Sequence, residues 1–219
     1  MQKIKLTLLL LIWCSCAFSQ QLTAEEKIIF NEVAFTRKQV GEYELVHKWI
    51  IPIRYKVYGD ADAFVLKTID STFAQIKRLT KLDISRTDDD AEVNYIFVVG
   101  KDEKERARLS KGFEKYVNSY GATLFRSNKA SEIVKAETLL MSEKYNDRAA
   151  AKSAIVKNIV KSLGFFKRTK LISSSLFYEQ NNGIQKISTF DSHIIAMLYH
   201  SLIRPGMDKD QVREILAGL

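Results

Sequence analysis

Two segments of the chain place apolar residues at helical spacing and therefore predict long helices. Over residues 61–82 the apolar positions recur every three or four residues, which puts them on one face of an amphipathic helix. They are Val65, Ile69, Phe73, Ile76 and Leu79. Residues 147–163 repeat the pattern with Ile155, Val156, Ile159, Val160 and Leu163. Gly164 follows directly and predicts a helix stop, because glycine adopts a positive φ without steric cost.

Other segments have the composition of strands. Residues 49–58 alternate around Ile53, Tyr55 and Val57, although Pro52 restricts their start to an edge or a bulge. Residues 91–99 are apolar enough for a central strand. Two more strands are predicted over residues 83–86 and 131–141, a charged helical or irregular segment over 101–117, and a turn at 120–121. The expected fold is α/β (α+β), a mixed twisted sheet packed on two long helices.

The rest of the chain completes this organisation. Thr23, followed by Glu25 and Glu26, suits the start of a short helix within a lead-in over residues 20–44. One domain is expected over residues 45–219, with a C-terminal helical subdomain.

Residues 1–19 predict a secretory signal peptide. Lys3 and Lys5 precede an apolar run over residues 6–13, and small residues at Ala17 and Ser19 suit cleavage before Gln20. The run is shorter than the about 20 apolar residues that span a bilayer, and no later stretch approaches that length. We therefore expect export to the periplasm, the cell surface or the medium, and no transmembrane segment.

Both cysteines, Cys14 and Cys16, lie in this leader. A mature chain that starts at Gln20 would contain no disulfide, no thiolate metal site and no cysteine nucleophile. The alternative is cleavage after Ser15 and a lipid anchor on Cys16.

Composition and charge limit the class of partner. Hydrophobic residues make up 46% of the 219 residues, which excludes wholesale disorder. The net charge of +8 invites a nucleic-acid partner, but removal of the leader leaves 32 basic and 26 acidic residues, or +6. Acids such as Asp102, Glu103, Glu105 and Glu114 are mixed through the basic stretches. Together with export, this mixture argues against nucleic acid.

The helix over residues 147–163 resembles the metal-binding helix of the zincin superfamily, but its metal ligands are replaced. Zincins carry H-E-x-x-H there, since two histidines four apart share a helix face and the glutamate acts as base. Metzincins extend this motif to H-E-x-x-H-x-x-G-x-x-H. With Gly164 as anchor, the motif positions read Lys157, Asn158, Lys161, Gly164 and Lys167. A lysine ammonium has no lone pair and asparagine cannot take a proton from water, so we expect no metal, no cofactor and no catalytic residue.

Later segments extend the resemblance. Residues 175–178, Ser-Leu-Phe-Tyr, resemble the Met-turn of matrixin-type proteases, with Phe177 at the methionine position. Residues 187–199 resemble their closing helix. The string over residues 198–207, Leu-Tyr-His-Ser-Leu-Ile-Arg-Pro-Gly-Met, is closer still to a family of bacterial secreted proteins and lipoproteins, domain of unknown function 2927. This resemblance covers about residues 45–219 and implies a zincin-like fold in which the histidine ligands are often incomplete.

Other patterns are weaker. His193 and His200 are seven residues apart, too far for two ligands on adjacent helical turns, and His47 has no carboxylate or cysteine pattern near it. We interpret the acidic run over residues 88–90 as a solvated turn rather than a calcium loop. The densest basic cluster is interpreted first as a solvated helix face and second as an anion- or peptide-binding surface. It comprises Lys157, Lys161, Lys167, Arg168 and Lys170.

These observations favour an exported, metalloprotease-like protein without catalysis that binds or scaffolds a partner. The partner would be a protein, a peptide or an anionic glycan, held as an extended segment between the strand over residues 131–141 and the helix that carries Lys157. The first alternative is a metal-dependent hydrolase or peptidase with ligands that the motif comparison misses, such as Glu137, Glu143 or His193. The second is an anion-binding surface protein.

Overall fold

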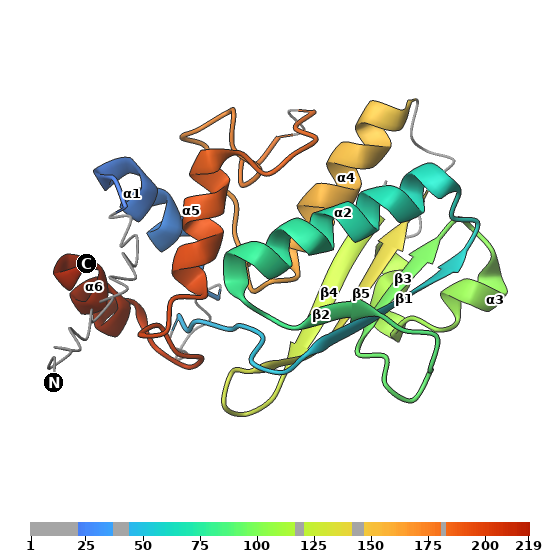
Figure 1. The fold of residues 1–219 in the computed structure, drawn as a ribbon, viewed down its shortest axis with the longest axis horizontal. Coiled ribbons are helices and arrows are strands. Elements are labelled where there is room, and N and C mark those ends of the chain that lie inside the picture. Colours follow the sequence, from blue (N-terminus) through green and yellow to red (C-terminus); the bar gives the residue numbers. More distant parts are fainter. Residues whose placement is uncertain (1–21, 37–43, 117–120, 142–146, 181–182) are drawn as a thin grey trace, which may run out of the picture.

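The structure, a computed structural model, describes residues 22–36, 44–116, 121–141, 147–180 and 183–219. Over these residues it is a mixed α/β fold with a five-stranded sheet (Figure 1). The strands lie in the order β2-β1-β3-β5-β4. Four of them run parallel, and β4 runs antiparallel to β5. Their bounds are β1 (Ile53–Gly59), β2 (Ile84–Arg86), β3 (Tyr95–Val99), β4 (Gly121–Ser127) and β5 (Ile133–Leu140).

The helices form two groups around this sheet. The long helices α2 (Ala63–Thr80) and α4 (Arg148–Lys161) lie side by side over one face (Figure 1). A short helix α3 (Glu103–Arg106) and a 3-10 helix (Lys111–Tyr116) lie at one end. Three more helices gather at the other end, namely α1 (Ala24–Val33), α5 (Thr189–Leu198) and α6 (Lys209–Gly218).

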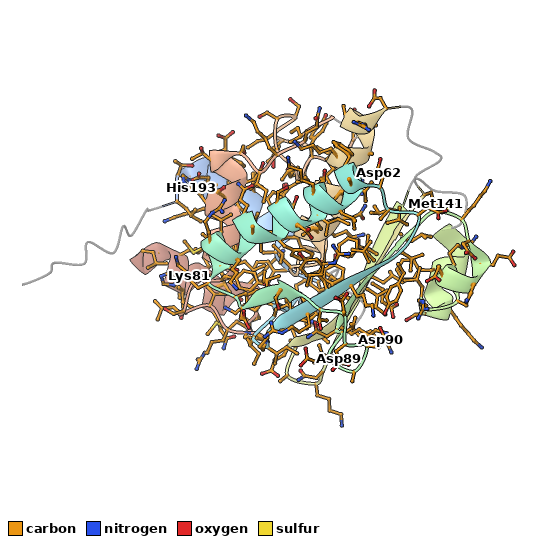
Figure 2. All side chains as sticks on the ribbon, turned by 45° about the vertical axis from the view of Figure 1, so that its right-hand side comes forward. Asp62, Lys81, Asp89, Asp90, Met141 and His193 are labelled. Carbon is orange, nitrogen blue, oxygen red and sulfur yellow. The ribbon has the colours of Figure 1, made fainter. Side chains whose placement is uncertain are left out.

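Local sequence explains most of these elements. The side chain of Asp62 caps the N-terminus of α2, and Lys81 ends the helix with φ of 62°, as Figure 2 shows at the two ends of α2. The side chains of Thr23 and Glu26 form a reciprocal capping box at the start of α1. The structure confirms the helices expected over residues 61–82 and 147–163. It also confirms a central strand, β3, at the end of the segment 91–99.

One strand prediction was wrong in detail, and one strand was not predicted. The strand expected over residues 49–58 begins only at Ile53, because Pro52 has no N–H to donate to a ladder. The turn expected at residues 120–121 falls partly outside the described residues, and Gly121 instead begins β4. This strand had no visible alternation because both of its faces are covered: Ala122 and Leu124 contact one apolar cluster, and Phe125 the other.

The unpredicted β4 changes which strand is at the edge. The strand expected over residues 131–141 is β5, which pairs with β3 on one side and β4 on the other. The outer strand on this side of the sheet is therefore β4 and not β5.

Aromatic rings fill the layer between the sheet and α2. The ring centroid of Phe73 on α2 lies 4.4 Å from that of Tyr55 and 5.4 Å from that of Tyr95. The rings of Tyr95 and Phe97 are stacked, with their centroids 4.6 Å apart. The same apolar cluster continues through α4 to α1, α5 and α6. A smaller cluster lies on the opposite face of the sheet and includes Val98, Phe113 and Leu139.

A buried lysine joins the terminal helices to the sheet. Lys48 is only 7% exposed, and its ammonium donates to the carbonyl oxygens of Leu198, His200 and Ile203 at 3.3, 3.4 and 2.5 Å. These carbonyls belong to the C-terminal end of α5 and the turn after it. The backbone carbonyl of Lys48 accepts from the N–H of Ile133, where β5 begins. Burial lowers the pKa of Lys48 to about 8, and no carboxylate among the described residues pairs with it.

We predict that the Lys48 ammonium makes stability rise with pH. The unfolded chain, with a lysine pKa near 10.5, keeps a proton that the folded chain releases above about pH 8. The free energy of unfolding should therefore increase by about 1–2 kcal/mol between pH 7 and about 9.5. Lys48→Met should lower stability at pH 7, because three carbonyls lose their donor, and should flatten this increase. Urea unfolding at several pH values measures both effects, and parallel pH profiles for the two proteins would contradict the prediction.

Candidate functional site

The end of α4 determines the geometry of the motif region. After α4, Gly164 adopts φ of +117°, and a Cβ built on it would lie 1.9 Å from the carbonyl oxygen of His47. Only glycine fits here, since any side chain would meet backbone and the conformation is strained for other residues. The predicted glycine stop is confirmed, and the structure adds its reason, the close approach of the chain at His47.

Two aromatic side chains cap the last carbonyls of this helix end. Trp49 Nε1 donates to the carbonyl of Ser162 at 2.9 Å, and Tyr199 Oη donates to that of Leu163 at 2.9 Å. The N–H of Trp49 in turn donates to Tyr199 Oη at 3.3 Å. All of these side chains are buried or nearly so, and burial raises the pKa of Tyr199 well above its usual value. Tyr199, the C-cap residue of α5, therefore also caps the end of α4.

Asn158, at the position of the zincin glutamate, belongs to a buried hydrogen-bond network. Its amide Nδ2 donates to the carbonyl of Ala154 at 2.9 Å, which leaves Oδ1 to accept from Thr123 Oγ1 at 3.0 Å. Thr123 has one hydroxyl proton, so Thr138 must donate to Thr123, at 2.8 Å, and Tyr95 to Thr138, at 3.0 Å. Burial raises the pKa of Tyr95 to about 12, so this donor keeps its proton. The network ties α4 to the three strands β3, β5 and β4.

The three lysines at the zincin histidine positions have different surroundings. Lys157 is half-buried and its ammonium donates to the carbonyl of Gln180 at 3.3 Å. Burial, and secondly the charge of Arg168, lowers its pKa. Lys161 is half-buried at the last position of α4. Lys167 instead forms an ion pair with Glu44.

Glu44 also pairs with Lys209 of α6, at 2.8 Å. The hydrogen bonds from Lys167 and then Lys209 lower the pKa of the Glu44 carboxyl. Glu44 therefore joins Lys167, in the segment after α4, to Lys209 of α6.

The rest of the predicted basic cluster surrounds residues 179–180. Arg168 donates to the carbonyl of Glu179 at 2.9 Å, and Lys170 lies 3.9 Å from its carboxylate. The structure thus brings Lys157, Arg168 and Lys170 to one segment and places Lys167 in a separate ion pair.

The segment that resembles a Met-turn is fixed by a buried carboxylate. Asp191, fully buried at the start of α5, accepts hydrogen bonds from Ser175 Oγ at 2.6 Å and from the N–H of Leu176 at 3.1 Å. Its second oxygen accepts from the N–H and Oγ of Ser188, which completes a capping box for α5. The ring of Phe177 lies 4.6 Å from that of Phe165, the residue after the motif glycine.

With this geometry established, a comparison with protein families identifies the chain. A family model described as "Protein of unknown function (DUF2927)" matches residues 24–218. The chain belongs to this family. The match confirms the resemblance seen in residues 198–207 and extends it to α1 at the N-terminal side. No curated protein matches the chain.

The other candidate ligands of this DUF2927 protein do not converge. Glu137 faces the side of the sheet away from α4 and pairs with Lys135 at 2.6 Å. His193, labelled in Figure 2 far from Met141 at the end of β5, binds Glu26 of α1 at 2.6 Å. Glu143 lies outside the described residues. Within the described part of the chain, no three His, Cys, Asp or Glu side chains are grouped so that they could hold a metal ion.

The acidic turn interacts with the sheet of this DUF2927 protein. Asp90 accepts hydrogen bonds from Lys56 and Tyr58 of β1, each at 2.7 Å, and Asp89 bonds the N–H of Ala91 (Figure 2). The Lys56 ammonium therefore compensates the charge of the Asp90 carboxylate, and the Tyr58 hydroxyl adds a hydrogen bond.

Sequence reasoning missed one residue at the motif in this DUF2927 protein. The backbone carbonyl of His47 lies against Gly164. The ring nitrogen Nδ1 of His47 is 2.7 Å from Ser127 Oγ at the end of β4, and the ring packs edge-on against Phe166, with centroids 5.1 Å apart. Burial lowers the pKa of His47 and so favours the neutral form of its ring. No sequence signal points to it, because both partners come from distant parts of the chain.

We predict that Gly164→Ala lowers the free energy of unfolding by about 2–4 kcal/mol, since it adds both a backbone strain and a clash with the His47 carbonyl. The matched control is Gly183→Ala, where φ is +65° but no atom lies within 4 Å of the added Cβ. That control should cost only about 1 kcal/mol. Chemical denaturation compares the two variants, and equal losses would show that the close approach at His47 contributes nothing.

Proposed function

We propose that this DUF2927 protein is an exported, zincin-like protein that keeps the frame of a metalloprotease and binds an extended segment of a partner without catalysis. The observation that carries the proposal is the hydrogen bond between Asn158 on α4 and Thr123 on the edge strand β4. It holds helix and strand in a fixed relation, while the residue that would act as base has become a neutral structural amide.

The chemistry of the motif residues supports a role without zinc. Lys157 offers an ammonium group that already binds the Gln180 carbonyl, and Lys167 is engaged with Glu44. Although burial lowers the pKa of Lys157, a protonated amine remains a poor ligand near neutral pH. Both sides of the Asn158 amide are occupied by protein partners. This donor set does not fit a zinc ion, so no catalytic step through a metal is derived for it.

The edge strand β4 supports a role in binding. It pairs with β5 on one side, and on the other side it pairs with no strand among the described residues. Such an edge presents backbone N–H and C=O groups that can add a strand from another chain. We therefore transfer the proposed binding surface from the strand over residues 131–141 to β4, with α4 next to it.

Charge indicates the chemistry of the bound segment. Lys157 neighbours Asn158 on α4, and Arg168 is close enough to lower the pKa of Lys157. Two adjacent cations favour a segment that carries carboxylates. An acidic peptide strand therefore fits this surface better than a neutral or basic one.

Export is part of the proposal and rests on the leader sequence, whose residues lie outside the described part. The proposed processing is cleavage between Ser19 and Gln20, with lipidation of Cys16 as the alternative. In the described residues no helix combines the length and apolar character needed to cross a membrane.

We predict that the purified protein binds extended acidic peptides and that Lys157→Glu weakens this binding about tenfold or more, since a like charge replaces an attraction. The control is Lys152→Glu, which makes the same charge change five residues earlier on α4, where the side chain points elsewhere around the helix. Fluorescence anisotropy with labelled acidic peptides and their basic counterparts measures both. Unchanged binding by the Lys157 variant, or equal binding of basic peptides, argues against the proposed surface.

Metal analysis separates this proposal from the alternative of a metal-dependent hydrolase. We expect less than stoichiometric zinc in the purified protein and the same melting temperature before and after chelation, because the motif offers no adequate ligand set. One zinc ion per chain, whose removal lowers the melting temperature, would refute the non-catalytic proposal and favour ligands not recognised here.

A further inference from the structure

A cavity lies on the face of the sheet opposite α2 and α4. It has a volume of about 300 Å³, is open to solvent on one side, and is bordered by α3, the start of the 3-10 helix and β5. Leu139 of β5 lines it, whereas the preceding residue Thr138 belongs to the network with Asn158. Successive strand residues point to opposite faces, so the cavity is separated from the α4 surface by the full thickness of the sheet. It is independent of the function proposed above.

The floor of the cavity is apolar and well packed. Leu139 is fully buried and Phe113 is 4% exposed, and both belong to the smaller apolar cluster of this face. Leu109 is partly buried and packs against the same cluster. The accessible apolar surface for a flat ring or a short hydrocarbon chain therefore comes from Leu109 and the exposed edge of Phe113, and Leu139 packs beneath them.

Two cations line the cavity without an acidic partner. Neither Arg106 nor Lys111 forms an ion pair with any described residue. Two other cations of this region are paired instead: Arg108 with Glu105 at 2.7 Å, and Lys135 with Glu137 at 2.6 Å. Among the described lining residues, Glu103 is the one acid. The lining therefore carries an uncompensated positive charge next to an apolar floor.

A buried carboxylate fixes the wall of the cavity. The N–H of Ser110 donates to Glu137 Oε2 at 3.1 Å, and Arg126 donates to Ser110 Oγ at 3.4 Å. Glu137 is 3% exposed. Burial raises its pKa, but hydrogen bonds from Lys135 and Ser110 outweigh that effect and keep the pKa below its usual value. Because this charged anchor is buried and paired, the segment between α3 and the 3-10 helix is held in place, and the cavity is formed before any ligand enters.

We propose that this cavity binds a small amphiphilic carboxylate, with its ring or short acyl chain on Leu109 and the edge of Phe113, above Leu139, and its carboxylate between Arg106 and Lys111. An arginine guanidinium matches the planar carboxylate with two parallel N–H donors, and a lysine adds a point charge. The volume lies at the lower end for small-molecule sites, which limits the ligand to one ring or a chain of a few carbons.

The test uses 3-phenylpropionate and the neutral 3-phenylpropan-1-ol as probes of equal shape. Titration of the purified protein, followed by NMR of methyl groups, should give saturable shifts at Leu139 and Leu109 with the carboxylate. The alcohol should bind at least tenfold more weakly. The variant R106Q/K111Q should reduce carboxylate affinity at least tenfold and bring it close to that of the alcohol.

Two further variants make the result decisive. K101Q/K104Q removes the same charge from exposed residues of the same region that do not line the cavity, and it should bind as the unchanged protein does. Ala107→Trp places a bulky ring at the rim, where Ala107 is exposed, and should abolish binding of both probes. Absence of saturable shifts at millimolar carboxylate would overturn the proposal. So would equal loss in the two double variants, or full binding to Ala107→Trp in a protein with an unchanged NMR fingerprint.

Discussion

The contact between Gly164 and the carbonyl of His47 is the constraint on which the rest of the structure depends. It places the end of α4 next to residues 47–49, which precede the first strand of the sheet. Each of these three residues makes a contact that depends on this proximity. His47 contacts β4 and Phe166, Trp49 caps the Ser162 carbonyl, and Lys48 between them reaches the carbonyls after α5. If the approach at Gly164 opened by the width of a methyl group, all of these short hydrogen bonds would have to lengthen together.

A buried polar network links α4 to the sheet. Here the chain of donors from Tyr95 through Thr138 and Thr123 to Asn158 makes the link between helix and sheet. In a dry core each member must be satisfied, since an unpaired polar group would cost more than the hydrogen bond gains. The amide at position 158 ends this chain of three hydroxyl groups by accepting from Thr123, and a glutamate there would bring a charge into the same buried space.

The parts of the fold that could be predicted from the sequence are those determined by local pattern. The 3.6-residue period predicts α2 and α4, the apolar run predicts β3, and Gly164 predicts the helix stop, because each signal lies within one element. The strand β4 escaped prediction because both faces are covered and the alternation that marks a half-buried strand is lost. The roles of Lys48 and His47, and the cavity near Arg106, escaped for a different reason. Each depends on residues far apart in sequence, and no pattern within one segment records a partner beyond it.

The strand β5 links the two surfaces of the molecule and limits how either can change. Thr138 and Ala136 face α4, whereas Leu139 and Glu137 face the cavity, and strands pair with β5 on both sides. A shift of one residue would exchange the two sets and place Glu137 against the buried face of α4. Two sets of hydrogen bonds therefore fix the register of β5. On one face this is the hydroxyl network through Thr138, and on the other it is the buried Glu137 carboxylate, which accepts from the N–H of Ser110. Outside this frame the constraints on side-chain chemistry are weaker. Lys157 and Lys161 on α4 are only half-buried and take no part in the hydroxyl network, so residues of other chemistry fit these positions without a change of the strand register.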